Sequence, residues 1–591
     1  MRTRRASTLY LALAVMGIAT VAAISGSHRV IAQSGQGRLG LPEDWSHRHV
    51  VFSNTRDIPL LLKIRQDPRV LHQWLKQNGS ALNSGSRVPV HDLQEQFRIR
   101  GLDSDANEGN VGQDHVDWSI SLGAANSIIP RAKYPAKYSF DINAPPSCAN
   151  DFVIFETGRN GNAGQATLVG FNNLYSTQGS VGGFCNQNGP SVKWAYNTGS
   201  VIMTSPVISL DGTKVAFVSR LPGTVHVLTL GTTGANGTSA IAPAVAGTGN
   251  NAVDVRVALN GGHRVTSSSL FVDYGNDVGY VGDDNGILHK ITGVFTGTPA
   301  EVTTGGWPIN VTAGAASLND AVFDSSVSKN IFVTDASGNL SYVREVGSTS
   351  GACASGTPPC LGFPVLAVSS GSPIVDSPVV DYVTGRVFSE TQANGANAQI
   401  VQSDTALGNV VRVNVGLQDP AANPLHNGAF DANYLNSVST GFYYVCGKSN
   451  SAAVNPTLYR IGFNAAGVMN AVPDVATFRL GRSAGQCSPI TQLLNTGTGK
   501  QWLFVAVSTR CGGTALIGGG CIMSFDTTAG MPAAATASVL QRNGTSGIII
   551  DNVSTAAQAS SIYFTDEGTG RCGDGIATGG CATKLTQAGL Q

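Results

Sequence analysis

The sequence predicts an all-β protein folded as a β-propeller, with eight four-stranded blades or, as the alternative, seven, and a small, partly helical N-terminal extension. Three observations support this prediction. The 591 residues include 72 Gly and 25 Pro and are 42% hydrophobic, which is turn-rich but below the roughly 25–30% Gly and Pro of low-complexity chains. Short strands recur at a regular spacing. The last repeat also lacks an outer strand that a segment near the N-terminus could supply.

The repeat runs from about residue 138 to the C-terminus. Each unit opens with a short apolar strand such as SPVISLDG, followed by a β-branched or aromatic strand such as VAFVS, and then by a third such as TVHVLTL. Many units add a fourth, such as VVRVNVGL. Successive anchors in the first strands lie 65, 50, 57, 51, 60 and 59 residues apart: Val207, Val272, Val322, Val379, Phe430, Ile490 and Ile549. Four-stranded meanders at this spacing are typical of propellers, whose ring leaves only short edges.

The ends of the chain predict how the ring closes. The last unit stops at ATKLTQAGLQ without a fourth strand, while an isolated strand pattern, DWSISLG, spans residues 117–123. We expect this segment to be the outer strand of the last blade and to act as a clasp.

The remaining N-terminal residues divide into two expected parts. Residues 1–32 have the basic start and the apolar run of a secretory signal. Residues 33–136 form the extension, with a short helix over about 67–78 that begins at Asp67-Pro68 and carries an apolar stripe. The propeller is then expected over residues 137–591, without a membrane span in the mature chain.

Cysteine usage agrees with export. The ten cysteines fit a disulfide framework better than metal ligation, because no C-x2-C pair or nearby histidine pair occurs. Connectivity is open from sequence, but pairing by proximity gives Cys148–Cys185, Cys353–Cys360, Cys446–Cys487, Cys511–Cys521 and Cys572–Cys581.

Charge excludes one class of partner. The chain has 37 basic and 37 acidic residues, and only 13% of its residues are charged. Nucleic-acid binding needs clustered Lys and Arg, so it is not expected. We expect a monomer whose partner is a protein or an extracellular polysaccharide.

Units such as SPVVDYVTGRVFSET and FVDYGNDVGYVGDDNGILHKI resemble blades of the PQQ-like and YVTN-type propeller superfamilies over about three quarters of the chain. LPEDWSHRHVVFSN and DWSISLG resemble parts of exported bacterial proteins of the same layout. The resemblance implies a fold but no activity, because propellers host many functions. The blade tryptophans and vicinal cysteines of quinoprotein dehydrogenases are missing, so no quinone cofactor is predicted.

One acidic position recurs after the first strand of the repeats, as Asp141, Asp211, Asp273, Asp324, Asp381, Asp431 and Asp551. Such residues commonly accept backbone N–H bonds in a turn. The alternative is a ring at one face of the channel that concentrates cations, calcium among them, or binds a basic partner.

The remaining motifs indicate structure. His226 and His289 occupy the same position of the third strand in two units, which suggests a repeated structural slot. Asp283–Gly286 lacks the ligand spacing of a calcium loop, and Asn285-Gly286 predicts a type I′ hairpin turn.

These observations favour an exported binding or scaffolding module that acts through its face loops and central channel, in the periplasm, at the cell surface or outside the cell. No complete catalytic set is present in the sequence. The alternative is a propeller enzyme, either a quinoprotein-like dehydrogenase or a carbohydrate-active hydrolase or lyase, that uses acidic channel residues.

Overall fold

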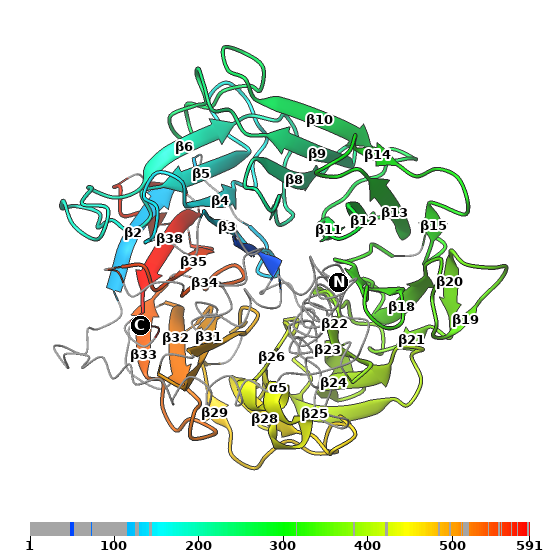
Figure 1. The fold of residues 1–591 in the computed structure, drawn as a ribbon. Helices are drawn as coiled ribbons and strands as arrows, with labels where there is room; N and C mark the ends of the chain where they lie inside the picture. Colours follow the sequence, from blue (N-terminus) through cyan, green and yellow to red (C-terminus); the bar gives the residue numbers. More distant parts are fainter. Residues whose placement is uncertain are drawn as a thin grey trace, which may run out of the picture.

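The chain folds into eight four-stranded blades around a central axis, as Figure 1 shows for this computed structural model. The structure describes residues 48–52, 73, 115–123, 129–140 and 145–590, the last range with short gaps. The eight-bladed propeller predicted from the repeats is confirmed. The predicted signal and most of the extension lie outside the described residues. Of the helix expected over 67–78, only Gln73 is described, in a helical conformation.

Each blade is an antiparallel meander. The inner strands are β3 (Ala136–Ser139), β7 (Val207–Ile208), β11 (Phe271–Asp273), β16 (Val322–Phe323), β22 (Val379–Asp381), β26 (Ala429–Phe430), β30 (Thr491–Asn495) and β34 (Ile549–Asp551). The second strands are β4 (Phe152–Glu156), β8 (Lys214–Ser219), β12 (Val278–Gly282), β17 (Asn330–Thr334), β23 (Arg386–Asn394), β27 (Phe442–Lys448), β31 (Lys500–Val507) and β35 (Ser561–Thr565). The third strands are β5 (Leu168–Asn172), β9 (Thr224–Thr229), β13 (Ile287–Thr292), β18 (Asn339–Arg344), β24 (Asn397–Asp404), β28 (Pro456–Gly462), β32 (Cys521–Asp526) and β38 (Cys581–Thr586).

The outer strands vary more than the others. They are β6 (Ser191–Tyr196), β10 (Val253–Ala258), β14 (Ala300–Glu301) with β15 (Ile309–Asn310), β20 (Cys360–Phe363) with β21 (Leu366–Ala367), β25 (Val411–Leu417), β29 (Phe478–Arg479), β33 (Ala537–Leu540) and β2 (His115–Ser121). Smaller elements are β19 (Ala352–Cys353), the ribbon β36 (Gly570–Arg571) with β37 (Ala577–Thr578), the helix α5 (Ala432–Asn436) and the 3-10 turn η4 (Val438–Thr440).

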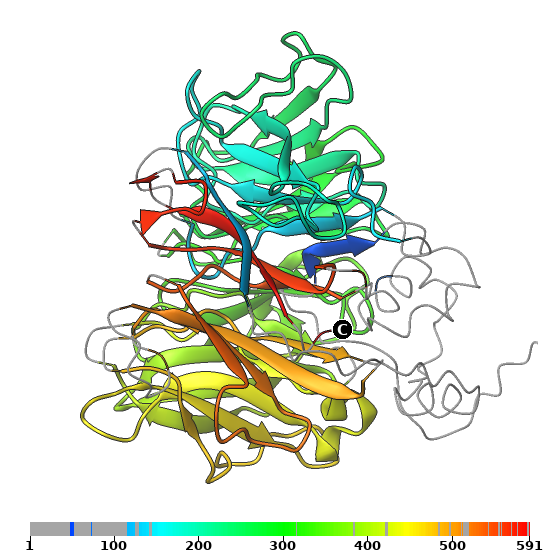
Figure 2. The same ribbon diagram turned by 90° about the vertical axis from the view of Figure 1, so that its left-hand side faces the viewer.

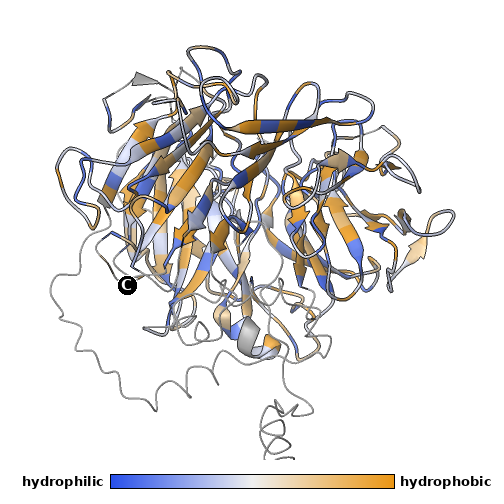
Figure 3. Cartoon of the chain, turned by 45° about the horizontal axis from the view of Figure 1, so that its top comes forward, coloured by the Kyte–Doolittle hydropathy of each residue, from blue (hydrophilic) through white to orange (hydrophobic). Residues whose placement is uncertain are grey.

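The core lies between neighbouring blades. The second strands β4, β17 and β35 are buried along their whole length, and apolar residues run through the middle of the sheets in Figure 3. Because both faces of each blade are covered by other blades, few positions remain for charged side chains. This packing explains the low charge of the sequence.

The eighth blade is completed by β2, which pairs antiparallel with β38 and lies beside it in Figures 1 and 2. The fully buried Trp118 of β2 lies 6.0 Å, ring to ring, from both Phe171 of blade 1 and Tyr563 of blade 8. Asp117 forms an ion pair with Lys584 of β38, and both side chains are fully buried. The strand pairs as predicted for the clasp, but it begins and ends two residues earlier than the predicted segment 117–123.

A second N-terminal strand, β1 (Val50–Phe52), lies inside the channel, where it pairs in parallel with β3. The Arg48 guanidinium lies 3.6 Å from the ring centre of Phe271 in blade 3. His49 stacks on Tyr134 and makes a 3.1 Å contact with the carbonyl of Pro206 in blade 2. This segment joins the first three blades from within.

All five cysteine pairs predicted by proximity are bonded in the structure. Cys446–Cys487 connects β27 of blade 6 to the loop before β30 of blade 7, whereas Cys353–Cys360 connects β19 to β20 at the rim of blade 4. Five disulfides indicate an oxidising compartment. Among the described residues, no helix is long and apolar enough to cross a membrane.

The turn between β12 and β13 differs from the prediction. A type I′ turn needs positive φ at both central residues, but here Gly286 has φ +78° while Asn285 has no positive φ. Asp283 Oδ1 accepts hydrogen bonds from the backbone N–H groups of Asn285 and Ile287, at 2.9 and 2.8 Å. The carboxylate therefore shapes this turn through local contacts that the Asn-Gly pair did not reveal.

Candidate functional site at the channel mouth

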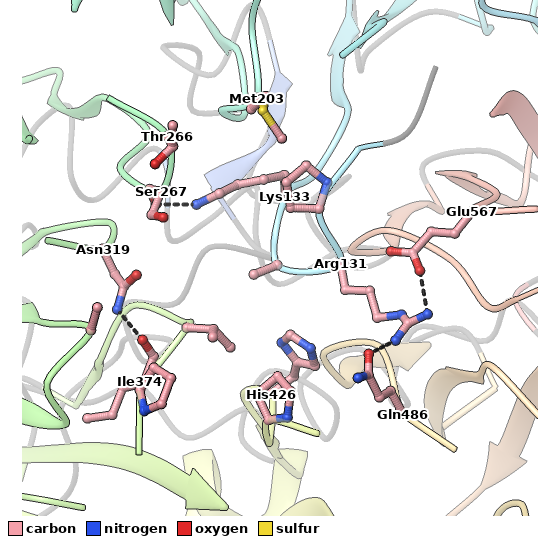
Figure 4. A pocket seen from close by; sticks show the side chains of 16 residues that line it. Arg131, Lys133, Met203, Thr266, Ser267, Asn319, Ile374, His426, Gln486 and Glu567 are labelled. Atoms are coloured by element: carbon pink, nitrogen blue, oxygen red, sulfur yellow. Dashed lines mark hydrogen bonds and ion pairs between the residues drawn. The ribbon is translucent and has the colours of Figure 1, made fainter. Parts of the chain in front are cut away.

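A cavity of about 590 Å³ lies at one end of the central channel (Figure 4). Its lining comes from the loops before the inner strands of blades 1 to 7, together with Ala336 of blade 4 and Glu567 of blade 8. All eight blades therefore reach it. Its size is within the roughly 300–1,000 Å³ of ligand sites.

One repeat position supplies three of the polar side chains that line the cavity. We call the third residue before each inner strand the pre-strand position, because the strand registers make these residues equivalent. Its eight members are all buried: Lys133, Thr204, Ser268, Asn319, Asp376, His426, Ser488 and Ser546.

In four blades this position is structural. Its hydroxyl accepts a hydrogen bond from a backbone N–H of the second strand in the same blade, at 2.8 to 3.3 Å, in Thr204, Ser268, Ser488 and Ser546. The other four blades carry Lys133, Asn319, Asp376 and His426 instead, and all of these except Asp376 line the cavity. The repeat therefore departs from its structural residue at the channel mouth.

Two buried carboxylates lie behind the cavity and hold cationic or ionisable groups in place. Lys133 Nζ donates to both oxygens of Asp320, at 2.7 and 2.8 Å, and to the carbonyl of Ser267 at 2.7 Å. His426 Nδ1 lies 2.7 Å from one Asp376 oxygen. The other Asp376 oxygen accepts the backbone N–H of Asn427 at 2.7 Å.

This arrangement fixes the histidine tautomer. Because a carboxylate accepts at Nδ1, the neutral ring carries its proton there and presents Nε2 as a hydrogen-bond acceptor. Within the described parts of the chain, Nε2 makes no hydrogen bond. Figure 4 shows the His426 ring on the cavity wall beside Arg131.

The third pair lies across the cavity from Asn319. Arg131 Nη2 is 2.5 Å from Glu567 Oε2, and the guanidinium also donates to Gln486 and to the carbonyl of Asn543. Burial raises the pKa of Glu567 to about 7, although Arg131 opposes the shift. This carboxyl group is therefore partly protonated at neutral pH.

The loops that carry the site are tied to one another around the ring by hydrogen bonds between neighbouring blades. Tyr134 N–H donates to Ser205 Oγ, Ser205 N–H to Ser269 Oγ, and Ser269 N–H to Asp320. Further links run from Asn319 to Ile374, from Asn427 to Asp376, from Ile490 to Asn427, from Thr491 to Ile548 and from Gly547 to Lys133. The cavity wall is thus preorganised.

The repeated aspartates lie at the opposite end of the inner strands from this cavity. Four of the six described ones accept backbone N–H bonds from the following turn or helix, as a turn role requires: Asp211, Asp273, Asp324 and Asp431. Asp381 accepts from the hydroxyls of Thr384 and Tyr434, and Asp551 pairs with Lys137 at 2.9 Å. Asp141 lies outside the described residues.

These contacts do not test cation binding by the aspartates, which stays a prediction. Asp324, Asp381, Asp431 and Asp551 are each at most 3% exposed. The described residues contain no cluster of three or more His, Cys, Asp and Glu side chains that could hold a metal ion.

His226 and His289 occupy equivalent slots, as predicted. His226 Nδ1 lies 3.0 Å from Asp254 and Nε2 3.1 Å from Ser219 Oγ, an order that resembles a catalytic triad. Ser219 and His226 are each only 2% exposed. In blade 3, Glu301 and Asp283 take the places of Asp254 and Ser219 around His289. The shared arrangement joins strands within one blade and gives a substrate no access.

Sequence reasoning missed the cavity residues. The signal was the polar residue that precedes the apolar first strand, visible as the serine of SPITQLL, and the change of this residue type in some units. Whether the changed residues line one cavity depends on which blades face each other across the axis.

Comparison with known proteins finds no matching family model and no matching curated protein. Among solved structures, the chain is similar to BamB from Moraxella catarrhalis, with 12% identity and TM-score 0.36, over 73% of this chain and 94% of that one. It is also similar to Sqt1 from Chaetomium thermophilum (8%, TM-score 0.46, 81% and 98%) and to Sqt1 from Saccharomyces cerevisiae (9%, TM-score 0.43, 81% and 99%).

Proposed function

We propose that this protein is an exported binding module that recognises its ligand in the channel-mouth cavity. The observation that carries the proposal is the change of the pre-strand position from Ser or Thr to Lys133, Asn319, Asp376 and His426 in four blades. A repeat protein keeps a residue that its architecture needs. In three of the four blades the replacement is a buried ionisable group, which costs stability, so the exchange at one end of the channel supports a role in recognition.

The charge arrangement supports binding more than catalysis. Lys133 uses its three N–H donors on Asp320 and Ser267, and Arg131 is held by Glu567, Gln486 and Asn543. A preorganised polar wall with mutually neutralised charges suits selective recognition of a ligand. The disulfides and the predicted signal support a periplasmic, cell-surface or extracellular location, and a protein or polysaccharide remains the proposed source of the ligand.

One observation favours an enzyme as the second candidate. An imidazole oriented by a carboxylate, as in His426 and Asp376, is the arrangement of a general base. Turnover of a bound probe would select this candidate.

The test is ligand-detected NMR with a defined library of sugars, amino acids and small organic acids. Ala336→Trp fills the cavity lining, and Ala533→Trp places the same side chain at an exposed position outside that lining. We expect at least one probe to bind wild type and Ala533→Trp but not Ala336→Trp. Probes that bind all three proteins alike, or none of them, would contradict the proposal.

A further inference from the structure

The channel-mouth cavity has a polar atom that is held in orientation but makes no hydrogen bond with the described residues, and the charges around it are nearly balanced. This atom is Nε2 of His426, whose other ring nitrogen is held by Asp376 at 2.7 Å. In the neutral ring Nε2 accepts a hydrogen bond. Its natural complement is an O–H or N–H group on the ligand.

The groups around His426 define the charge that a ligand meets. Arg131, Lys133 and Glu567 line the cavity, while Asp320 and Asp376 stand directly behind Lys133 and His426. The two cations therefore face three carboxyl groups. Of these, Glu567 is partly neutralised, because burial raises its pKa to about 7.

Two further groups lie one layer deeper. Glu390 is close enough to Asp376 to interact with it electrostatically, and it accepts a hydrogen bond from Tyr443. Lys448 pairs with Asp419 at 2.8 Å and carries no unbalanced charge toward the cavity. Among the described residues at this site there is therefore no surplus of positive charge for an anion, and each carboxyl group already accepts a hydrogen bond from a neighbouring group.

From these observations, and resting on the proposed function, we infer that the ligand is a neutral, hydroxyl-bearing molecule of the sugar or polyol class. A ligand hydroxyl donates to His426 Nε2 and can accept from the neighbouring Arg131 guanidinium. The rings of Pro130, Pro373 and Pro424 give the wall apolar C–H surface next to these polar groups. Sugar rings present the same combination of hydroxyls and C–H faces.

Matched probes that differ only in charge test this inference. Glucose, glucosamine and glucuronate supply a neutral, a cationic and an anionic form of one sugar. Galactose with galactosamine and galacturonate supplies a second series, and mannose, N-acetylglucosamine and glycerol widen the neutral set. We expect at least one neutral probe to bind, and its charged forms to bind at least about tenfold more weakly. Dextran and galactan, added as further probes, show whether the protein binds the end of a polysaccharide or a free sugar.

Two variants locate the contact. His426→Asn removes Nε2 from the cavity and is expected to weaken binding of the neutral probe about three- to tenfold, the range of one neutral hydrogen bond. Met203→Leu changes the lining without changing polarity and is expected to bind as wild type does. Thermal unfolding of each variant confirms that the fold is retained.

A spectroscopic readout separates a ligand contact from a structural role. In protein labelled with ¹⁵N-histidine, the Nε2 signal of His426 is expected to move when the neutral probe is added. The signals of His226 and His289, which lie outside the cavity lining, serve as internal controls.

Three results would overturn the inference: no neutral probe binding, a charged probe binding more tightly than its neutral form, or an unchanged affinity in His426→Asn. If charged probes bind wild type but not Ala336→Trp, the proposed function stands and only the ligand class is wrong. If no probe depends on the cavity, both fail.

Discussion

Glu156 and Glu390 occupy the same position of the second strand in blades 1 and 5. Burial raises the pKa of each to about 8; Lys133 lowers that of Glu156, and a hydrogen bond from Tyr443 lowers that of Glu390. Neither Glu156 oxygen has a hydrogen-bond partner among the described residues. A protonated, unpaired carboxyl group in the core is a stability cost that depends on pH.

The direction of this pH dependence follows from the difference between the pKa of Glu156 in the folded and in the unfolded protein. The unfolded carboxyl group ionises at about pH 4.5 and the folded group at about 8. The folded protein therefore holds the extra proton between these values, and stability falls as pH rises through this window. We expect Glu156→Gln to raise the free energy of unfolding by about 3–5 kcal/mol at pH 9 and to change it little at pH 4.5. Urea unfolding at several pH values measures this. If the free energy of unfolding falls with pH as steeply in Glu156→Gln as in wild type, then Glu156 is ionised in the folded protein.

At the scale of elements, the clasp strand β2 depends on a buried charge as well as on backbone pairing. Asp117 accepts from Lys584 and, at 2.6 Å, from Thr586 Oγ1. Burial lowers the pKa of Lys584, and Asp117 opposes that shift. The ion pair favours the register in which β2 joins β38.

Asp117→Asn is expected to destabilise the protein by about 3–5 kcal/mol, because it removes the ion-pair partner of the buried Lys584 charge. The double variant Asp117→Leu/Lys584→Met removes both charges and should recover much of this loss. Thermal and urea unfolding compare the two. A double variant as unstable as the single one would show that the hydrogen bonds, and not the charge, hold the clasp.

The channel strand β1 can be tested separately. Val51 is 1% exposed, so Val51→Asp places a charge in the channel core. Since Lys137 N–H donates to the carbonyl of His49 at 2.8 Å, release of β1 is expected to speed hydrogen exchange in peptides that cover β3. Val253→Asp, at a position 54% exposed on β10, is the matched control. Unchanged exchange at β3 would mean that β1 tolerates the charge in place.

At the scale of the whole molecule, a propeller ring needs to be closed and its blades kept in order. Here the N-terminal region contributes twice, with β2 outside blade 8 and β1 inside blade 1. Cys446–Cys487 links blades 6 and 7 covalently. Closure is therefore secured at more than one place.

The disulfides are expected to differ in their contribution. Replacing Cys446 and Cys487, 41 residues apart, with serine should lower the free energy of unfolding by about 4 kcal/mol. Replacing Cys353 and Cys360, 7 residues apart, should cost about 2–3 kcal/mol, because the shorter loop constrains the unfolded chain less. Urea unfolding of the two double variants tests the order. Equal losses would contradict the loop-length argument.

The sequence by itself determined the repeat of four-stranded blades, and it predicted the cysteine pairs and the clasp. Each of these is encoded locally, as alternating apolar strands, as cysteines close in the chain, or as a strand missing from the last unit. It also identified the recurring aspartates after the first strands, because a turn often uses the same residue in each repeat.

Only the tertiary structure decided where a ligand could bind. Lys133, Asp376 and His426 occupy the same repeat position but differ in residue type, and their relation appears only when the ring places the pre-strand positions around one axis. The same holds for β1, whose three residues are too short for a sequence pattern and become a strand through pairing with β3. Local periodicity encodes blades, whereas a site on the axis is made by the packing of all of them.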